Sequence, residues 1–129
     1  MCNIPSGVSC TVEVTFSLNP VEQFDQAGLF VWLDNSHWLK TGIEFADGQP
    51  RLSCVVCNVF SDWSVQPWPD AAAKIRVHKV THNSSVVVEA AVPGTDKWEF
   101  VRIAHLSAQA SHIGIAGDTP HLCIPTFFC

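Results

Sequence analysis

Short runs of alternating apolar and polar residues, each closed by turn-forming residues, limit how this chain can fold more than any other feature. From Val8 to Leu18 the even-numbered positions are mostly apolar, and successive side chains of a strand point to opposite faces. Asn19-Pro20 ends this run, and Asp47-Gly48 is a strong signal for a tight hairpin. This rhythm predicts an all-β protein, a sandwich or barrel of antiparallel strands.

The same pattern places the strands along the chain. We expect them at residues 8–18, 27–34, 37–45, 51–60, 74–80, 85–91, 98–106 and 112–116. Helical periodicity is weak, and the candidate segments 70–73 and 107–111 are each about one turn long. With 129 residues and no internal repeat or linker, residues 1–129 are expected to form a single domain.

Composition and charge argue against several classes of function. Hydrophobic residues make up 47% of the chain, which is too apolar for a disordered segment. The formal net charge is −5 with 7 Lys and Arg, so the sequence lacks the basic stripe that binds nucleic acid or an anionic membrane. No run approaches the ~18 apolar residues of a membrane helix, and residues 1–6 lack the pattern of a signal peptide. We therefore expect a soluble, cytoplasmic protein with no nucleic-acid or membrane partner.

Two neighbouring predicted strands carry aromatic and charged side chains on one face. In residues 27–34 and 37–45, a mainly apolar row lies opposite a row that mixes tryptophan with charged groups. Flat aromatic surface beside charged groups suits sugar-type ligands, although an ordinary solvated sheet face has the same pattern. A basic row in residues 74–80 is predicted to join this face. The residues predicted for it are Trp32, Trp38, Lys40, Glu44, Arg76 and His78.

The segment Ser61-Asp62-Trp63-Ser64 allows two interpretations. An aspartate two residues before a serine readily forms an Asx-type turn, in which case Trp63 would close one end of the sandwich. The alternative is that Asp62 and Trp63 contact the ligand directly.

Three of these segments, taken in order, resemble the regulation-of-enolase family. They are Phe24-Asp25-Gln26-Ala27-Gly28-Leu29, the run His37-Trp38-Leu39-Lys40-Thr41-Gly42-Ile43-Glu44-Phe45, and Ser61-Asp62-Trp63-Ser64. Arg102-Ile103-Ala104-His105 also fits a later strand, so the resemblance covers residues 8–116. It implies a concanavalin A-like lectin/glucanase fold, a jelly-roll sandwich, in a soluble intracellular protein. It implies no defined activity.

The chain departs from the family at both ends. Family members have further strands ahead of the position of Val8, and they end with another alternating strand that residues 120–129 do not resemble. The apolar row that begins at Val8 would then lack a neighbour, and Pro125 cannot donate to a ladder. An uncovered hydrophobic edge recruits other chains. We therefore expect self-association through this strand.

Sequence motifs for catalysis are missing. The E-x-D-x-E strand motif, which places the two carboxylates of glucanases on one face, does not occur, and Glu44 and Asp47 are three residues apart. An activated serine in a G-x-S-x-G turn does not occur either. We expect a protein that is not an enzyme, with no catalytic residue and no cofactor.

The six cysteines are expected to be free thiols without a metal. Cys54-x-x-Cys57 has the spacing of half a zinc site, but it lies in a predicted strand, where residues three apart point to opposite faces. Cytosolic thiols also stay reduced. Two buried structural thiols are the expected outcome.

Three functions fit these observations. The first is a non-catalytic module that binds a carbohydrate or a sugar-like metabolite on the aromatic face. The second is a protein-interaction domain that regulates a metabolic enzyme of the enolase type. The third is a degenerate glycoside hydrolase. A shallow groove lined by Trp, Lys and Glu would favour the first, a flat apolar patch the second, and a deep cleft with convergent carboxylates the third.

Overall fold

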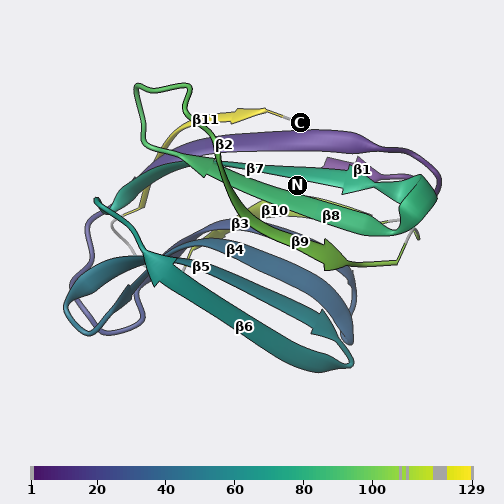
Figure 1. Cartoon of the computed structure of the whole chain (residues 1–129), viewed down its shortest axis with the longest axis horizontal. Coiled ribbons are helices and arrows are strands. Elements are labelled where there is room, and N and C mark those ends of the chain that lie inside the picture. Colours follow the sequence, from purple (N-terminus) through teal and green to yellow (C-terminus); the bar gives the residue numbers. More distant parts are fainter. Residues whose placement is uncertain (1, 108, 110, 118–121, 129) are drawn as a thin grey trace.

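The computed structural model describes residues 2–107, 109, 111–117 and the backbone of Leu122–Phe128, and it shows two stacked layers of strands (Figure 1). The only helical element within these residues is the 3₁₀ turn η1 (Thr81–Asn83), so none of them forms a helix that could cross a membrane. The strands are β1 (Cys2–Ile4), β2 (Cys10–Leu18), β3 (Gln26–Asp34), β4 (His37–Ala46), β5 (Gln49–Asn58), β6 (Phe60–Pro67), β7 (Ala72–Val80), β8 (Ser85–Ala91), β9 (Glu99–His105), β10 (Ser111–Gly117) and β11 (Leu122–Phe128).

The strands form two antiparallel sheets. The six-stranded sheet has the order β1-β10-β3-β4-β5-β6, and the five-stranded sheet has the order β11-β2-β7-β8-β9. Tight hairpins join β3 to β4, β4 to β5 and β5 to β6. The β4–β5 turn has φ values of 54° at Asp47 and 74° at Gly48, which is the left-handed backbone that a type I′ hairpin requires. The predicted hairpin at Asp47-Gly48 is therefore confirmed.

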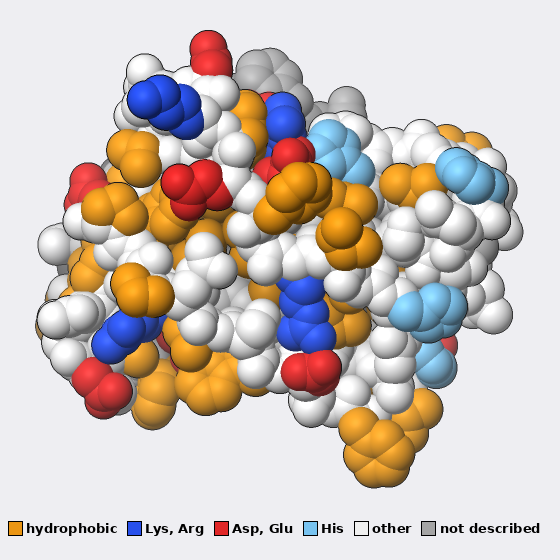
Figure 2. All heavy atoms as spheres, in the orientation of Figure 1, with side chains coloured by type: hydrophobic (Ala, Val, Ile, Leu, Met, Phe, Trp, Pro, Cys, Tyr) orange, Lys and Arg blue, Asp and Glu red, His pale blue; other side chains and the backbone are white. Residues whose placement is uncertain are grey.

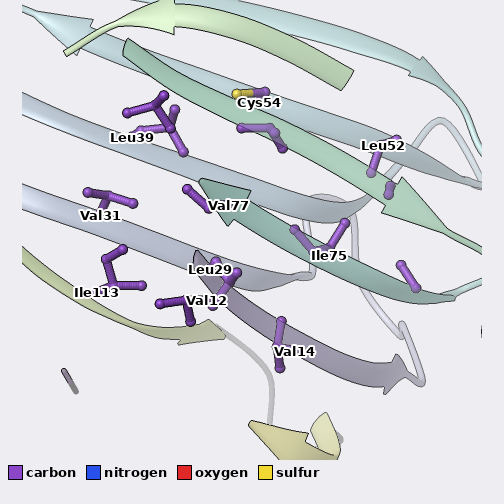
Figure 3. Packing of buried hydrophobic residues seen from close by; sticks show 14 of the residues in the cluster. Val12, Val14, Leu29, Val31, Leu39, Leu52, Cys54, Ile75, Val77 and Ile113 are labelled. Atoms are coloured by element: carbon purple, nitrogen blue, oxygen red, sulfur yellow. The ribbon is translucent and has the colours of Figure 1, made fainter. Parts of the chain in front are cut away.

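Alternate side chains of each sheet fill the space between the layers. Figure 3 shows Leu29, Val31 and Leu39 of one sheet in the same interlayer space as Val77 and Ile75 of the other. These side chains are fully buried, and each contributes about 1.5–3 kcal/mol to folding by leaving water. The alternation in the sequence therefore has the packing consequence expected of a sandwich.

The predicted all-β sandwich is confirmed, and each predicted strand exists with slightly different ends. Three strands were not predicted. β1 is only 3 residues long. The sequence pattern divided β6 between the predicted strand 51–60 and a turn at 61–64. It predicted no strand over β11, which contains a proline. Each of them is an outermost strand of its sheet, where local sequence is a weak guide because half of the ladder partners are missing.

The expectation that β2 would lie at an uncovered edge is wrong. β2 pairs with β7 on one side and with β11 on the other, and Val12, Val14 and Phe16 are buried. The register of β11 shifts between Cys123 and Thr126, which lets the ladder pass Pro125 although proline has no N–H to donate. The reason for expecting self-association through β2, an uncovered edge, is therefore absent.

The free-thiol expectation is wrong for Cys2, which is disulfide-bonded. Among the described residues, Cys10, Cys54 and Cys57 are free. Cys54 lies in the core and burial raises its pKa to about 11, so this thiol stays protonated at neutral pH. Cys57 lies on the opposite face of β5, in the row of Trp38, as expected for residues three apart in a strand.

Lys79 is a cation in an otherwise apolar row. Its neighbours in the inward row of β7 are Ala73, Ile75 and Val77, and it is only 1% exposed. Its ammonium donates a hydrogen bond of 3.0 Å to the carbonyl oxygen of Gln109. Desolvation lowers the pKa of Lys79, because burial penalises the charged form.

This burial makes Lys79→Met a stabilising substitution at neutral pH. The folded-state pKa of Lys79 lies below 10.5, so the unfolded chain holds the proton more tightly and wild-type stability rises with pH through that window. Methionine removes the penalty, which is worth about 1.4 kcal/mol for each unit of pKa shift. Urea unfolding at neutral and at alkaline pH should show a gain that shrinks as the pH rises. The exposed Lys97→Met is the control, and a variant less stable than wild type at pH 7 would contradict this account.

Candidate ligand pocket on the six-stranded sheet

The outer face of the six-stranded sheet can be described as rows of residues that run across neighbouring strands. Strand register places Gly28 beside Gly42 and Gly42 beside Ser53 in one row. The next row contains Lys40, with Phe30 and Val55 on its two sides. Because residues directly opposite one another share a face, every member of these rows points away from the core.

Gly28 and Gly42 form the floor of a pocket. A Cβ atom on Gly28 would collide with the carbonyl oxygen of Thr41, and one on Gly42 would collide with the carbonyl oxygen of Ala27. Glycine is therefore required at both positions by the close approach of β3 and β4. The missing side chains leave a hollow in the middle of the sheet face.

Polar side chains surround this floor. The pocket has a volume of about 140 Å³ and is lined by Gln26, Ala27, Gly28, Lys40, Thr41, Gly42, Ile43, Glu44, Ser53, Ala116 and Gly117. The ammonium of Lys40 donates to Oε1 of Gln26 at 2.5 Å, which fixes its position over the pocket. Glu44 lies between Gln26 and Arg51 in register. The pocket thus offers a cation, a carboxylate, an amide and a hydroxyl over an open glycine floor.

Trp63 stands beside this pocket on β6. Its indole Nε1 donates to the hydroxyl of Ser53 at 3.1 Å, and 54% of the residue remains exposed. Of the two interpretations of this segment, the one in which it forms a turn and Trp63 closes the sandwich end is wrong, because the segment is part of a continuous edge strand. The indole instead offers a flat apolar surface next to the polar pocket wall.

Trp32 and Trp38 lie on the same outer face as Lys40 and Glu44, as predicted, but they do not line the pocket. They face each other across β3 and β4 and are half-buried. The Trp38 ring lies 5.8 Å from that of Phe30, and the Trp32 ring lies 5.8 Å from that of His112. These rings pack against one another and support the sheet beside the pocket.

The prediction that Arg76 and His78 share this face is wrong. Both belong to β7, which lies in the five-stranded sheet. They therefore lie on the opposite outer face of the sandwich from Lys40 and Glu44. Their outward side chains converge on Glu89 of β8, with Nε of Arg76 at 2.6 Å and Nε2 of His78 at 2.8 Å from one carboxylate oxygen. The hydrogen bond from Arg76 lowers the pKa of Glu89. Both basic side chains therefore stabilise their own sheet.

The prediction that Asp62 contacts the ligand is not supported by the pocket, because the Asp62 side chain faces away from it. Its register partner on β5 is Val56, a core residue, so Asp62 points to the inner side of the sheet. There its carboxylate accepts a hydrogen bond of 2.7 Å from Nη2 of Arg102 on β9. The pair ties the edge of one sheet to the edge of the other. The described residues hold no cluster of three or more metal-ligating side chains.

The sequence interpretation missed Gln26, Ser53 and the two floor glycines. A signal for the glycines existed, since an interior strand glycine often marks a close approach of backbone or ligand. Two such glycines in adjacent predicted strands could have identified the floor. Ser53 and Gln26 carry no comparable signal, because only the register of β4 with its two neighbours places them at the pocket.

The fold and this outer face define a concanavalin A-like β-sandwich with a small polar pocket on its six-stranded sheet. The chain belongs to the DUF1349 family, whose members are described as proteins of unknown function, and the family match covers residues 2–122. The resemblance to the regulation-of-enolase family is confirmed by a curated relative, Regulation of enolase protein 1 of Saccharomyces cerevisiae. That protein is 34% identical over 101 residues, which are 78% of this chain and 50% of the yeast protein.

Other relatives extend this picture. An uncharacterised protein of Emericella nidulans is 38% identical over 71 residues, covering 52% of this chain and 36% of that protein. The chain thus spans half or less of the curated relatives it matches. A solved structure of a functionally unknown protein from Saccharomyces cerevisiae superimposes with a TM-score of 0.86 at 26% identity, over 98% of this chain and 70% of that chain. A xylan beta-1,4-xylosidase from Bacillus halodurans matches with a TM-score of 0.74 at 16% identity, over 92% of this chain and 26% of the enzyme, which shows a shared fold alone.

The glycine floor should not tolerate a side chain. Gly28→Ala forces β3 and β4 apart, and we expect it to destabilise the protein by about 3 kcal/mol or more, as overpacking against backbone does. Gly48→Ala is the matched control, because it has open space but a positive φ, and it should cost only about 1 kcal/mol. Thermal melts would distinguish the two. Equal melting of Gly28→Ala and wild type would contradict the close approach.

Glu89→Gln should weaken the five-stranded sheet in a pH-dependent way. Because the folded-state pKa of Glu89 is lowered, its contribution is complete above the usual value of 4.5 and is lost as pH falls through the folded-state pKa. We expect a loss of about 1–2 kcal/mol at pH 7 that shrinks in acid. Urea unfolding at several pH values measures it, with the exposed Glu99→Gln as control. A deficit that is constant with pH would show that the carboxylate charge is not responsible.

Proposed function

We propose that this chain is a non-catalytic binding domain whose pocket holds a carbohydrate or a sugar-like metabolite. The observation that carries the proposal is the glycine floor flanked by Lys40, Gln26 and Glu44, with the exposed Trp63 ring beside it. A sugar presents hydroxyl groups that both donate and accept hydrogen bonds, together with an apolar ring face. Charged and amide side chains satisfy the hydroxyls, and an indole ring packs against the apolar face.

The size of the pocket supports a small ligand. Its volume of about 140 Å³ lies below the roughly 300–1,000 Å³ that is usual for sites that enclose a drug-sized molecule. A single sugar ring that enters edge-on, with the remainder in solvent, suits such a shallow hollow. Among the lining residues that the structure describes, Glu44 is the one carboxylate, whereas glycoside hydrolysis uses a pair. Binding is therefore favoured over hydrolysis.

A second candidate function is regulation of a metabolic enzyme through protein contact. It is favoured by the name of the yeast relative, Regulation of enolase protein 1, with which this chain shares 34% identity. The two functions are compatible, because a regulatory domain can respond to a bound metabolite. Purified enolase would be the first protein to test for binding.

Titration calorimetry with a panel of monosaccharides, short oligosaccharides and sugar phosphates tests the proposal. We expect Trp63→Ala to weaken binding by about threefold to tenfold, which corresponds to losing one aromatic contact of ~0.5–1.5 kcal/mol. Glu44→Gln and Lys40→Met should weaken it further, because each leaves a ligand hydroxyl without its charged partner.

The matched control is Trp98→Ala, since Trp98 packs on Arg76 at the five-stranded sheet and not at the pocket. It should leave the affinity unchanged. Binding of no member of the panel, or equal losses from Trp63→Ala and Trp98→Ala, would refute the proposed pocket. Binding of enolase without any sugar effect would favour the second candidate.

A further inference from the structure

The strand β6 is the least protected sheet edge in the part of the chain that the structure describes. At the other ends of the sheets, β1 has 3 residues, and the register shifts within the β11 ladder and within the β9 ladder. By contrast, β6 spans 8 residues, pairs with β5 without a shift and contains proline only as its last residue. Short length, bulges, prolines and inward-pointing charges are devices by which proteins block strand addition. Along its first seven residues β6 has only the last of these, at Asp62, whose carboxylate is paired with Arg102.

A hollow lies between this edge and β9, the border strand of the other sheet. Its volume is about 360 Å³, and it is lined by Val56, Asn58, Phe60, Asp62, Arg102, Ile103, Ala104 and His105. In Figure 1, β6 and β9 border the lower and upper layers on the same side of the molecule. The two sheets are therefore joined less closely here than in the core, and the open space meets the free edge of β6.

Large apolar side chains stand exposed around this hollow. Phe60 is 84% exposed, and Val59 beside it is exposed as well. Ile103 is 65% exposed, but it shares the outer face of its sheet with Val87. Hydrophobic side chains project at the lower right of Figure 2, over the turn between β5 and β6. Val59 has a φ of 69°, which is strained for a β-branched residue, and its N–H donates to the carbonyl oxygen of Ser36 at 2.7 Å. The apolar tip is thus held in place by the neighbouring hairpin.

We propose that the edge of β6 and the adjoining hollow bind an extended segment of a partner protein, which adds to the six-stranded sheet as a further antiparallel or parallel strand. In an edge strand, every second residue directs its N–H and C=O away from its one neighbour. Another polypeptide backbone supplies matching groups, whereas a lipid surface does not. Side chains on the inner side of the added strand would fill the hollow next to Phe60. The inference is independent of the proposed sugar pocket, which faces the outer side.

Charge defines the chemistry of this partner segment. Within the pair that spans the hollow, the side chain of Asp62 is 73% exposed and that of Arg102 only 19%, so the accessible charge is negative. The chain as a whole carries a net charge of −5. A second copy would bring the same charge, which disfavours it as occupant. The segment that fits alternates apolar residues with Lys or Arg placed to reach Asp62.

Selection of short random peptides from a display library against the full chain tests this inference. Selected peptides should alternate apolar residues with at least one Lys or Arg, and binding should slow hydrogen exchange of β6 amides. Phe60→Ser should weaken binding by about tenfold, the effect of losing an apolar anchor. Val21→Ser, which alters an exposed side chain before β3, should not. N-methylation of one alternate set of peptide amides should abolish binding, and methylation of the other set should not.

Several results would overturn the inference. They are a selection that yields no binder, binders that are unaffected by Phe60→Ser, and protection located outside β6. Protection of β6 in a dimer without peptide would assign the edge to a second copy. Binding to phosphatidylcholine vesicles that is lost in Phe60→Ser would assign the tip to a lipid surface.

Discussion

The packing of two inward-facing apolar rows against each other is the interaction on which the rest of this structure depends. Each sheet by itself has one hydrophobic face, and neither is stable until that face is covered. Side chains such as Leu29, Ile75 and Val88 cover one another across the interlayer space. Because the period of a strand is two, this packing also fixes which residues point outward. The outer faces, where the candidate functions lie, are therefore consequences of the core.

The two outer faces carry different chemistry although their sequences look alike. On the six-stranded sheet, the close approach of Gly28 and Gly42 removes side chains from the centre and leaves Lys40 and Glu44 beside open space. On the five-stranded sheet, Arg76 neutralises Glu89 and His78 is hydrogen-bonded to it, and Arg76 also lies 4.0 Å from the Trp98 ring centroid. The same mixture of aromatic, basic and acidic residues thus makes a hollow in one case and a closed network in the other. The candidate site is therefore distinguished by its open pocket and not by the types of residue that it contains.

The edges of the sheets show a third arrangement. Asp62 and Arg102 join β6 to β9, but Phe60 and Ile103 beside them remain in solvent. These two side chains do not cover each other, because Phe60 lies on the inner side of β6 and Ile103 on the outer face of β9. The charged pair keeps the two sheets in register while a free edge stays accessible. We therefore propose two separate binding surfaces on this chain, one for a small polar ligand and one for a polypeptide.

The sequence by itself determined the all-β class, most strand positions, the inward rows and the hairpin marked by Asp47-Gly48, because these depend on local alternation and turn chemistry. It also placed Trp32, Trp38, Lys40 and Glu44 on one face, since adjacent strands joined by a tight hairpin must pair. Only the tertiary structure decided which strands without a hairpin between them become neighbours. That choice put Arg76 and His78 in the other sheet, turned Asp62 toward Arg102 and brought β11 beside β2. Alternation specifies the two faces of a strand, but the identity of its neighbours depends on contacts between residues far apart in the chain, on which a local pattern carries no information.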